Sequence, residues 1–373
     1  MKASRVVVLL HQLTLTGSPR LTLETLVDIR EDAAVRIVAW EGGPLLNAAS
    51  RLGPTAVLHG AGSRPSLAAA GWRAKALMEA ALLRMWKPQL VYVSSVEALH
   101  MVGKLRLGSV PVALYVHELG SALASFEQTH PGLIASLPVR YAAISDAVGR
   151  DLVDVMGVPK GLVGVVRPFV LSPVPEPSQD LGSADRTPLV VGGAGKPSWT
   201  KGNDLWLLAA RDVMDRLGAD RVRFVWVGYR DNDDGLHFRS MISKLGLEGV
   251  VELIPETDRP HDHFARFDVF AMASWEESAS LVVLEAMAMS IPVICFAPTG
   301  GPAEEVGDAG VVIPGISPRG MADAIVDLAR SPQKRLAMGS AGAERVRAEF
   351  RREASVAALQ AVFDAAVTTR RRA

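Results

Sequence analysis

The sequence predicts an α/β protein of two Rossmann-like, doubly wound domains that face each other across a cleft. The chain has 373 residues, of which 49% are hydrophobic, so it exceeds what a single core usually holds. Short β-rich runs alternate with longer helical patterns, which indicates parallel α/β units. Between two series of such units, residues 171–188 are rich in Pro, Ser and Gly and lack hydrophobic periodicity, as is typical of a linker.

Each half of the chain offers a series of buried strands. In the first half they are RVVVLL (5–10), VRIVAW (35–40), TAVLHG (55–60), QLVYVSS (89–95), VPVALYVHE (110–118) and YAAIS (141–145). In the second half they are TPLVVGGAG (187–195), VRFVWVG (222–228), VVELIP (250–255), FDVFAMAS (267–274), PVICFA (292–297) and AGVVIP (309–314). We therefore expect an N-terminal domain over residues 1–170 and a C-terminal domain over residues 189–350.

The helical pattern at the end of the chain, from about Gly320 to Val367, is longer than a sixth strand unit needs. We expect its last part, residues 351–373, to form a C-terminal helix that could pack back on the N-terminal domain.

Composition excludes several classes of protein. The net charge is zero, whereas a dedicated nucleic-acid-binding domain is normally strongly basic, so we expect no nucleic-acid partner. The single cysteine, Cys295, lies in an apolar run and cannot form an internal disulfide. The first apolar run has five residues, too few for a secretory signal, and no run approaches the roughly 18 that a membrane span needs. We expect a cytoplasmic protein.

One helical stretch, residues 71–88, combines basic and aromatic residues. Arg73 and Arg84 are three helical turns apart and Lys87 follows three residues later, so the pattern predicts one shared face. Together with Trp72 and Trp86, this face could contact an anionic membrane surface. An ordinary solvated helix face is the alternative.

Common nucleotide-binding and hydrolase motifs are missing. In the loop GGAGKPSWTKG, the third glycine of a dinucleotide fingerprint would fall at Ser198. Pro197 follows Lys196 where a nucleoside-triphosphate P-loop needs Ser or Thr. No Gly-x-Ser-x-Gly nucleophile motif occurs.

Two patterns resemble metal ligands. Asp231–Asp234 (DNDD) follows a strand and leads into a helix, so we interpret it as a solvated turn that caps the helix. His261 and His263 follow Pro260 at the start of a helix, and two residues cannot complete a zinc site, so we expect them on the surface. We predict no metal site.

The loop before residue 203 has the features of an anion site. Lys201 and Gly202 lie between a Gly-rich turn and a helix for which Asn203 is a plausible N-cap. The N–H groups and positive end of the helix would favour an anion, and Lys201 adds a full charge. An exposed lysine in an ordinary βα loop is the alternative.

A second helix raises a question about its carboxylate. Residues 281–289 are apolar almost all round, which predicts a buried helix, yet Glu285 lies in its middle. A buried carboxylate is costly unless it is hydrogen-bonded. Ser280 is a candidate cap, so the N–H groups of Leu281, Val282 and Val283 would be free for a ligand, and Glu277 would lie at the end of the preceding strand.

These residues carry a resemblance to a known family. Glu277 and Glu285, followed by AMAMSIPVICFAPTGGPAEEV and DAGVVIPG, resemble the donor-site signature of retaining family 4 glycosyltransferases of the GT-B fold. The resemblance extends to LTLTGSPRLTLETL after the first strand, to YVHEL, to AAISDAVGRDLVDVMGVP and to GAGKPSWTKGNDLWL. It covers nearly the whole chain.

The resemblance implies a role for three residues in catalysis. Lys201 would hold the diphosphate of a nucleotide sugar and stabilise the charge on the leaving group, Glu277 would contact the transferred sugar, and His117 would lie at that sugar. In this family the anomeric configuration is retained. We expect no cofactor and no metal, and we favour attack by the acceptor on the same face as the departing phosphate.

The resemblance also implies a set of donor-binding residues. Glu285 would bind the ribose hydroxyls of the nucleotide, while Gly17 and Ser18 would frame the donor from the N-terminal domain, which would also bind the acceptor. The full set is Gly17, Ser18, Gly195, Lys196, Lys201, Ser280, Leu281, Val282 and Glu285.

The chain departs from the family pattern in two places. Ser278, Ala279 and Ser280 follow the first glutamate where the family usually has Gly, an aromatic residue and Gly. The phosphate loop lacks the usual arginine, for which Lys196 would substitute as a point charge.

The implied activity is transfer of a hexose from a nucleotide-diphosphate sugar to a hydroxyl of a glycan, lipid or small metabolite. The base, sugar, acceptor and oligomeric state are left open. A nucleotide-sugar epimerase or hydrolase of the same fold, or a non-catalytic donor-binding protein, are the alternatives.

Overall fold

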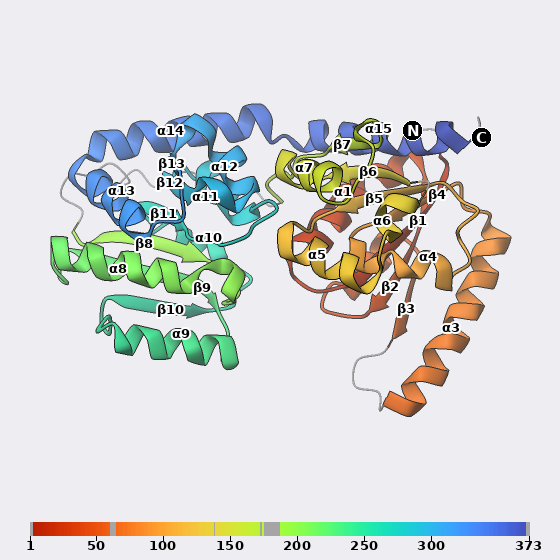
Figure 1. Ribbon diagram of the computed structural model, residues 1–373, viewed down its shortest axis with the longest axis horizontal. Helices are drawn as coiled ribbons and strands as arrows, with labels where there is room; N and C mark the ends of the chain where they lie inside the picture. Colours follow the sequence, from red (N-terminus) through yellow and green to blue (C-terminus); the bar gives the residue numbers. More distant parts are fainter. Residues whose placement is uncertain (1–2, 60–64, 138, 172–173, 175–186, 371–373) are drawn as a thin grey trace. The chain divides into compact units, whose positions relative to one another are not determined.

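The computed structural model describes residues 3–59, 65–137, 139–171, 174 and 187–370 (Figure 1). The chain divides into two compact units, one formed by Met1–Leu171 with Arg352–Ala373 and the other by Ser172–Arg351. Most of the expected linker, residues 172–173 and 175–186, lies outside the described residues. None of the helices in the described ranges is long and apolar enough to cross a membrane.

The first unit contains a parallel sheet in the order β3-β2-β1-β4-β5-β6-β7. Its strands are β1 (Arg5–Gln12), β2 (Ala34–Glu41), β3 (Thr55–His59), β4 (Leu90–Val93), β5 (Val112–Val116), β6 (Val139–Ala143) and β7 (Val163–Val165). The chain reverses its direction of travel through the sheet between β1 and β4, so polar residues that follow β1, β4 and β5 share one edge. The run Val163–Val165 was not predicted, because it is short and only half-buried.

Helices cover both faces of the sheet, and all of them except the C-terminal α15 lie between its strands in the chain (Figure 1). They are α1 (Gly17–Asp32), α2 (Leu46–Leu52), α3 (Pro65–Trp86), α4 (His100–Lys104), α5 (Gly120–Thr129), α6 (Leu133–Ser136), α7 (Asp146–Asp154) and α15 (Arg352–Arg370), with short 3-10 turns η1 (Val96–Ala98) and η2 (Lys160–Leu162).

The expected basic face on residues 71–88 is only partly formed. Arg73 and Arg84 are exposed on α3. Lys87, however, follows the end of the helix in a left-handed conformation with φ of 53°, so it does not continue the helical face. Trp72 packs edge-on against Trp40, with 5.2 Å between the ring centroids.

The second unit contains a parallel sheet in the order β10-β9-β8-β11-β12-β13. Its strands are β8 (Leu189–Ala194), β9 (Val222–Tyr229), β10 (Val251–Pro255), β11 (Val269–Met272), β12 (Val293–Phe296) and β13 (Val311–Ile313). All were predicted from their apolar runs. With the first unit, they confirm the predicted class of two doubly wound, parallel α/β sheets.

Seven helices of the second unit are described, together with three 3-10 turns. They are α8 (Asn203–Leu217), α9 (Asp233–Lys244), α10 (Pro260–Phe264), α11 (Leu281–Ala288), α12 (Gly301–Val306), α13 (Pro318–Arg330) and α14 (Pro332–Glu349), with η3 (Trp199–Lys201), η4 (Ala297–Thr299) and η5 (Gly307–Ala309).

The C-terminal helical pattern forms three helices. Pro332 begins a new helix after Ser331, and a second break follows at Phe350. The last helix, α15, packs on the first unit, where Phe363 contacts Tyr92 with 5.1 Å between the ring centroids. At its first turn, Arg352 forms ion pairs with Glu24 and Asp28 of α1 at 3.0 and 2.8 Å. Together these contacts attach the end of the chain to the first sheet.

Candidate functional site

The loop after β8 is shaped by glycine and holds Lys201 in place. Gly195 has a φ of 131°, which side chains rarely adopt, and its carbonyl oxygen accepts a hydrogen bond of 2.8 Å from Nε1 of Trp226. A Cβ on Gly195 would lie 3.3 Å from Cε of Lys201, so the lysine side chain extends directly over this glycine. The following residue, Lys196, is exposed.

The end of this loop differs from the predicted cap. Gly202, in a left-handed conformation with φ of 60°, is the N-cap of α8, and Asn203 is the first helical residue. A Cβ on Gly202 would lie 1.9 Å from the carbonyl oxygen of Ala273, so only glycine allows the helix to start this close to the end of β11. Oδ1 of Asn203 accepts a hydrogen bond of 3.2 Å from the N–H of Ser198. Asn203 therefore holds the loop in place through this hydrogen bond and does not cap the helix.

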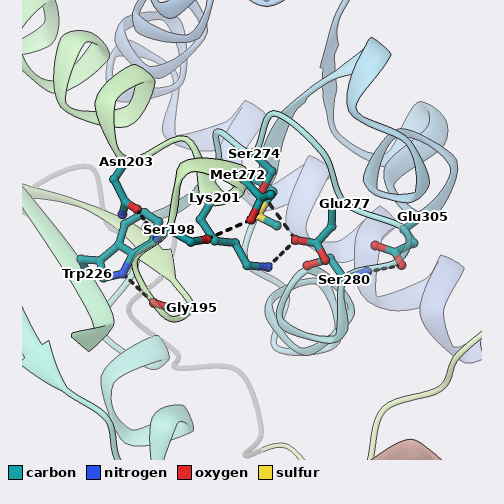
Figure 2. Close-up of polar contacts among 11 residues, drawn as sticks. Gly195, Ser198, Lys201, Asn203, Trp226, Met272, Ser274, Glu277, Ser280 and Glu305 are labelled. Atoms are coloured by element: carbon teal, nitrogen blue, oxygen red, sulfur yellow. Dashed lines mark hydrogen bonds and ion pairs between the residues drawn. The ribbon is translucent and has the colours of Figure 1, made fainter. Parts of the chain in front are cut away.

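The loop brings Lys201 to Glu277. Nζ of Lys201 donates to Oε2 of Glu277, and the two side chains point toward each other in Figure 2. The Glu277 backbone is fixed by a parallel bridge to Gly300 and by its N–H, which donates to the carbonyl of Thr299 at 2.9 Å. Both side chains retain some exposure, 24% for Lys201 and 14% for Glu277. An incoming anion would thus share the lysine with a carboxylate already in place.

Beyond Glu277, Ser280 begins α11 at the predicted position, but its hydroxyl makes no capping hydrogen bond. Its N–H donates to Oε1 of Glu305 at 2.7 Å, as Figure 2 shows. Oγ of Ser280 and Oε2 of Glu305 are both buried and lack a hydrogen-bond partner among the described residues.

Glu305 in α12 was not among the predicted site residues. Burial raises the pKa of its carboxyl well above the usual range, and the nearby Glu277 charge raises it further. The protonated form of Glu305 is therefore favoured relative to that of an exposed glutamate. Its only sequence signal is the paired Glu304-Glu305, which lies between apolar residues of a short helix.

The first turn of α11 offers fewer free N–H groups than expected. The N–H of Val283 donates to the carbonyl of Ser280 at 3.1 Å, so it is already used inside the protein. Leu281 and Val282 are the first two residues of the helix and are only half-buried. They remain the N–H groups of this turn that a ligand could reach.

Glu285 is buried in α11, with 3% of its surface exposed. Nε2 of His261, from α10, lies 3.6 Å from its Oε2. The prediction that His261 and His263 lie on the surface holds only in part, because both are half-buried and Nε2 of His261 is buried. Since Phe264 of the same short helix is fully buried, α10 is held against the core and His261 lies beside α11.

The first unit gathers its own group of candidates at the carboxyl ends of β1, β4 and β5. Gly17 and Ser18 form the start of α1, and Oγ of Ser18 donates to the carbonyl of Ser94 at 3.2 Å. His117 follows β5, and its Nε2 is buried without a hydrogen-bond partner in the described ranges. These residues therefore lie along one edge of the sheet, as the order of the strands requires.

Glu118, beside His117, is a residue that sequence reasoning missed. Its Oε2 accepts hydrogen bonds from the N–H groups of His117, at 3.0 Å, and Val96, at 3.4 Å. Burial raises the pKa of Glu118 to about 7 and lowers the pKa of His117 to about 3. His117 is thus uncharged at neutral pH, whereas the carboxyl of Glu118 titrates near neutral pH.

The remaining candidates are peripheral to these two groups. Asn232 caps α9 by accepting a hydrogen bond of 3.0 Å from the N–H of Gly235, which confirms DNDD as a helix-capping turn. In the part of the chain that the structure describes, no cluster of three or more His, Cys, Asp or Glu side chains has the arrangement to hold a metal ion. The Glu256 carboxylate has a lowered pKa, mainly from its hydrogen bonds to Arg230 and to a smaller extent from the charge of Lys196.

Comparison with known proteins finds a family match in the second unit and relatives that are similar over more than half of the chain. Residues 186–331 match the family described as glycosyl transferases group 1. The D-inositol 3-phosphate glycosyltransferase of Kineococcus radiotolerans is 31% identical over an aligned length of 230 residues, and the match covers 55% of this chain and 52% of the relative. The enzyme of the same name from Thermobispora bispora is 32% identical over an aligned length of 245 residues, and the match covers 61% of this chain and 56% of the relative. The chain spans about half the length of the curated relatives it matches.

Solved structures match over nearly the whole chain. Anabaena HepE in complex with UDP-glucose has a TM-score of 0.77 at 17% identity, covering 98% of this chain and 99% of that one. WaaG, described as a glycosyltransferase involved in lipopolysaccharide biosynthesis, has a TM-score of 0.70 at 13% identity, covering 96% and 99%. These matches confirm the GT-B fold, and the family match over residues 186–331 agrees with the glycosyltransferase resemblance that the paired glutamates indicated.

Proposed function

We propose, starting from the group 1 glycosyl transferase signature of residues 186–331 and the GT-B fold, that this protein is a retaining glycosyltransferase. It would move a hexose from a nucleotide-diphosphate sugar to a hydroxyl of a glycan, lipid or small metabolite. The observation that carries the proposal is the contact between Lys201 and Glu277 beside the start of α11. The Lys201 cation would suit an anionic diphosphate, and the Glu277 carboxylate would accept hydrogen bonds from the hydroxyl groups of a sugar.

Lys201 would stabilise the leaving group. In the absence of ligand, its charge is balanced by Glu277. When a diphosphate binds, Lys201 would contact it as well, and the free N–H groups of Leu281 and Val282 would add partial positive charge. Because negative charge grows on the diphosphate as the glycosidic bond breaks, these groups favour the transition state over the ground state.

Glu277 would bind hydroxyl groups of the transferred sugar through its free carboxylate oxygen. Its rigid backbone, held by Thr299 and Gly300, would fix the direction of that contact. We assign it no nucleophilic role, because it is already committed to Lys201. Retention would instead follow from attack by the acceptor hydroxyl on the face that the diphosphate leaves, with the diphosphate oxygens accepting the proton.

Glu285 would accept hydrogen bonds from the two ribose hydroxyls. A carboxylate offers two oxygens, which match the paired hydroxyl donors of a ribose. His261 lies 3.6 Å away and gives the carboxylate a polar neighbour when no nucleotide is bound. This accounts for a glutamate in an otherwise apolar helix.

His117 would contact the sugar in its neutral form, because burial lowers its pKa to about 3. A neutral imidazole donates or accepts a hydrogen bond without adding charge. We propose no metal requirement, since Lys201 supplies the positive charge at the diphosphate. The relatives named D-inositol 3-phosphate glycosyltransferases make a phosphorylated polyol the first acceptor to test.

The test measures release of nucleoside diphosphate from a panel of nucleotide sugars, with and without acceptors that include an inositol phosphate. Acceptor-dependent release that persists in a chelator supports the proposal. Equal release without any acceptor would indicate a hydrolase, and donor binding without turnover of any acceptor would indicate a non-catalytic protein. Loss of activity in chelator would overturn metal independence.

A further inference from the structure

A cavity of about 570 Å³ lies in the first unit, away from the site described above. Its walls are the last turns of α3, the turn that leads into β4 and residues 105–111, which lead into β5. It therefore opens at the amino ends of β4 and β5. Ser94 and His117 follow the carboxyl ends of the same strands, so the cavity lies at the opposite edge of the sheet. Its volume is within the range of small-molecule sites.

The rim of this cavity is strongly basic. Arg84, Lys87 and Arg106 line it, and no Asp or Glu does so among the described residues. All three cations are exposed, and none forms an ion pair with the part of the chain that the structure describes. The C-terminal ends of α3 and α4 contribute only about half a negative charge each. Three full positive charges therefore exceed them, and the rim favours an anion.

Two of these cations occupy backbone positions that usually belong to glycine. Lys87 has a φ of 53° and Arg106 a φ of 56°, both left-handed and both just after the end of a helix. Glycine is the common residue there because it has no Cβ to clash. A basic residue at both positions accepts a conformational cost and places two charges at the rim.

Aliphatic side chains form much of the cavity wall, together with Ser109. Leu77, Leu83, Leu105 and Leu107 line it, and the last three are buried. Next to it, an exposed stripe on α3 is formed by Met78, Leu82 and Met85, which are 61%, 36% and 72% exposed and spaced to share a helix face. A small hydrophilic anion would leave these apolar surfaces exposed to water.

We propose that this cavity is a binding site for an amphipathic anion, a molecule with a phosphate or carboxylate group and an apolar chain. The anionic group would be held by Arg84, Lys87 and Arg106, and the chain would enter between α3 and residues 105–111. Such a molecule is either a membrane lipid or a free long-chain phosphate or fatty acid. The site is separate from the proposed transferase site and does not depend on it.

The test uses dodecyl phosphate below its micellar concentration as the probe, titrated calorimetrically into the full chain. We expect saturable binding that weakens at least tenfold in Arg84→Gln/Arg106→Gln. The control, Arg73→Gln/Lys75→Gln, removes two exposed cations of the same helix that do not line the cavity, and its affinity is expected to stay within twofold. Absence of binding, or equal losses in both variants, would overturn the proposal.

Two further arms define the ligand. Inorganic phosphate binding as tightly as dodecyl phosphate would contradict the apolar half of the site. Cosedimentation with phosphatidylglycerol vesicles but not phosphatidylcholine vesicles, lost in the same variant, would support a lipid source; soluble dodecyl phosphate binding without vesicle binding would support a free ligand.

A second variant separates binding from folding. Lys87→Gly/Arg106→Gly relieves the left-handed backbone, so its melting temperature is expected to be no lower than that of the parent chain while probe binding falls at least tenfold. Unchanged probe binding in this variant would contradict a role for the two cations.

Discussion

Lys201 and Glu277, in the segments that follow the neighbouring strands β8 and β11 of the second unit, form an ion pair. Each residue was proposed from the sequence to contact a different part of one donor molecule. Their direct contact means that, without ligand, each neutralises the charge of the other. When a ligand binds, the Lys201 ammonium would therefore divide its contacts between Glu277 and the diphosphate.

Because of this ion pair, we expect Glu277→Gln to lower turnover without lowering the affinity for a nucleoside diphosphate. The neutral amide no longer competes for Lys201, so affinity for a nucleoside diphosphate is expected to stay equal or to rise by up to about fivefold, the size of a partly exposed ion pair of up to about 1 kcal/mol. Turnover is expected to fall at least tenfold, because the sugar loses a charged hydrogen-bond acceptor. Calorimetry and steady-state kinetics measure the two quantities. A tenfold loss of affinity for the nucleoside diphosphate would contradict the competition.

His261→Phe tests the neighbour of Glu285. Replacement of the imidazole by an apolar ring removes a polar neighbour at 3.6 Å, too far for a hydrogen bond, so the free energy of unfolding is expected to fall by up to about 1 kcal/mol. In a double-mutant cycle with Glu285→Gln, the coupling energy is expected to exceed about 0.5 kcal/mol.

His263→Phe is the matched control for this cycle, since His263 lies on the same short helix without a contact to Glu285 among the described residues. Additive effects of His261→Phe and Glu285→Gln, as for the control, would show that the 3.6 Å contact carries no energy.

From the shifted pKa values of the adjacent residues His117 and Glu118, we predict opposite contributions to the pH dependence of stability. The folded pKa of His117, about 3, is below its ordinary value of 6.5, so its contribution is complete above pH 6.5 and is lost as the pH falls toward 3. The folded pKa of Glu118, about 7, is above its ordinary value of 4.5, so its contribution is complete below pH 4.5 and is lost as the pH rises toward 7.

Variants separate the two contributions in denaturant unfolding between pH 4.5 and 6.5. Relative to the parent chain, His117→Gln should show less gain of stability with rising pH, and Glu118→Gln should show more. Identical slopes in the parent and both variants would contradict these shifted pKa values. The nitrogen chemical shifts of His117 provide a direct check, since they should not titrate between pH 5 and 8.

The raised pKa of Glu305 favours its protonated form, for which glutamine is a close substitute. Glu305→Gln keeps an acceptor for the N–H of Ser280, so we expect a change in unfolding free energy below about 1 kcal/mol. Glu305→Ala leaves this buried N–H unpaired and is expected to cost about 1 to 3 kcal/mol. Equal losses in the two variants at pH 7 would indicate that the carboxyl is ionised.

The strands were predictable because continuous apolar runs of the right length were bounded by Gly, Pro and polar turns. The exception, Val163–Val165, has three residues that are all half-buried and carries little periodic signal. The break of the C-terminal helical pattern at Pro332 follows from the ring of proline, whereas the attachment of α15 to the first sheet depends on contacts of Phe363 and Arg352 that no local pattern reveals.

The site was predictable where a residue is unusual for its local surroundings. Glu285 in an apolar helix and Lys201 after a glycine turn are of this kind. Asn203 was assigned to the cap because Asn is common there, but the close approach of Gly202 to Ala273 fixes the helix start and is visible only in three dimensions. His261, Glu118 and Glu305 gain their significance from partners on other elements, so their sequence neighbours give no indication of it.

The central claim is that Glu285 binds the ribose of a nucleotide donor. Its most direct test is calorimetric titration of the preferred nucleoside diphosphate, chosen by thermal shift, into the parent chain and into Glu285→Gln, with inorganic diphosphate as the control ligand. We predict at least tenfold weaker binding of the nucleoside diphosphate, about 1.4 kcal/mol, and unchanged binding of inorganic diphosphate. A nucleoside diphosphate affinity within threefold of the parent chain would contradict the claim.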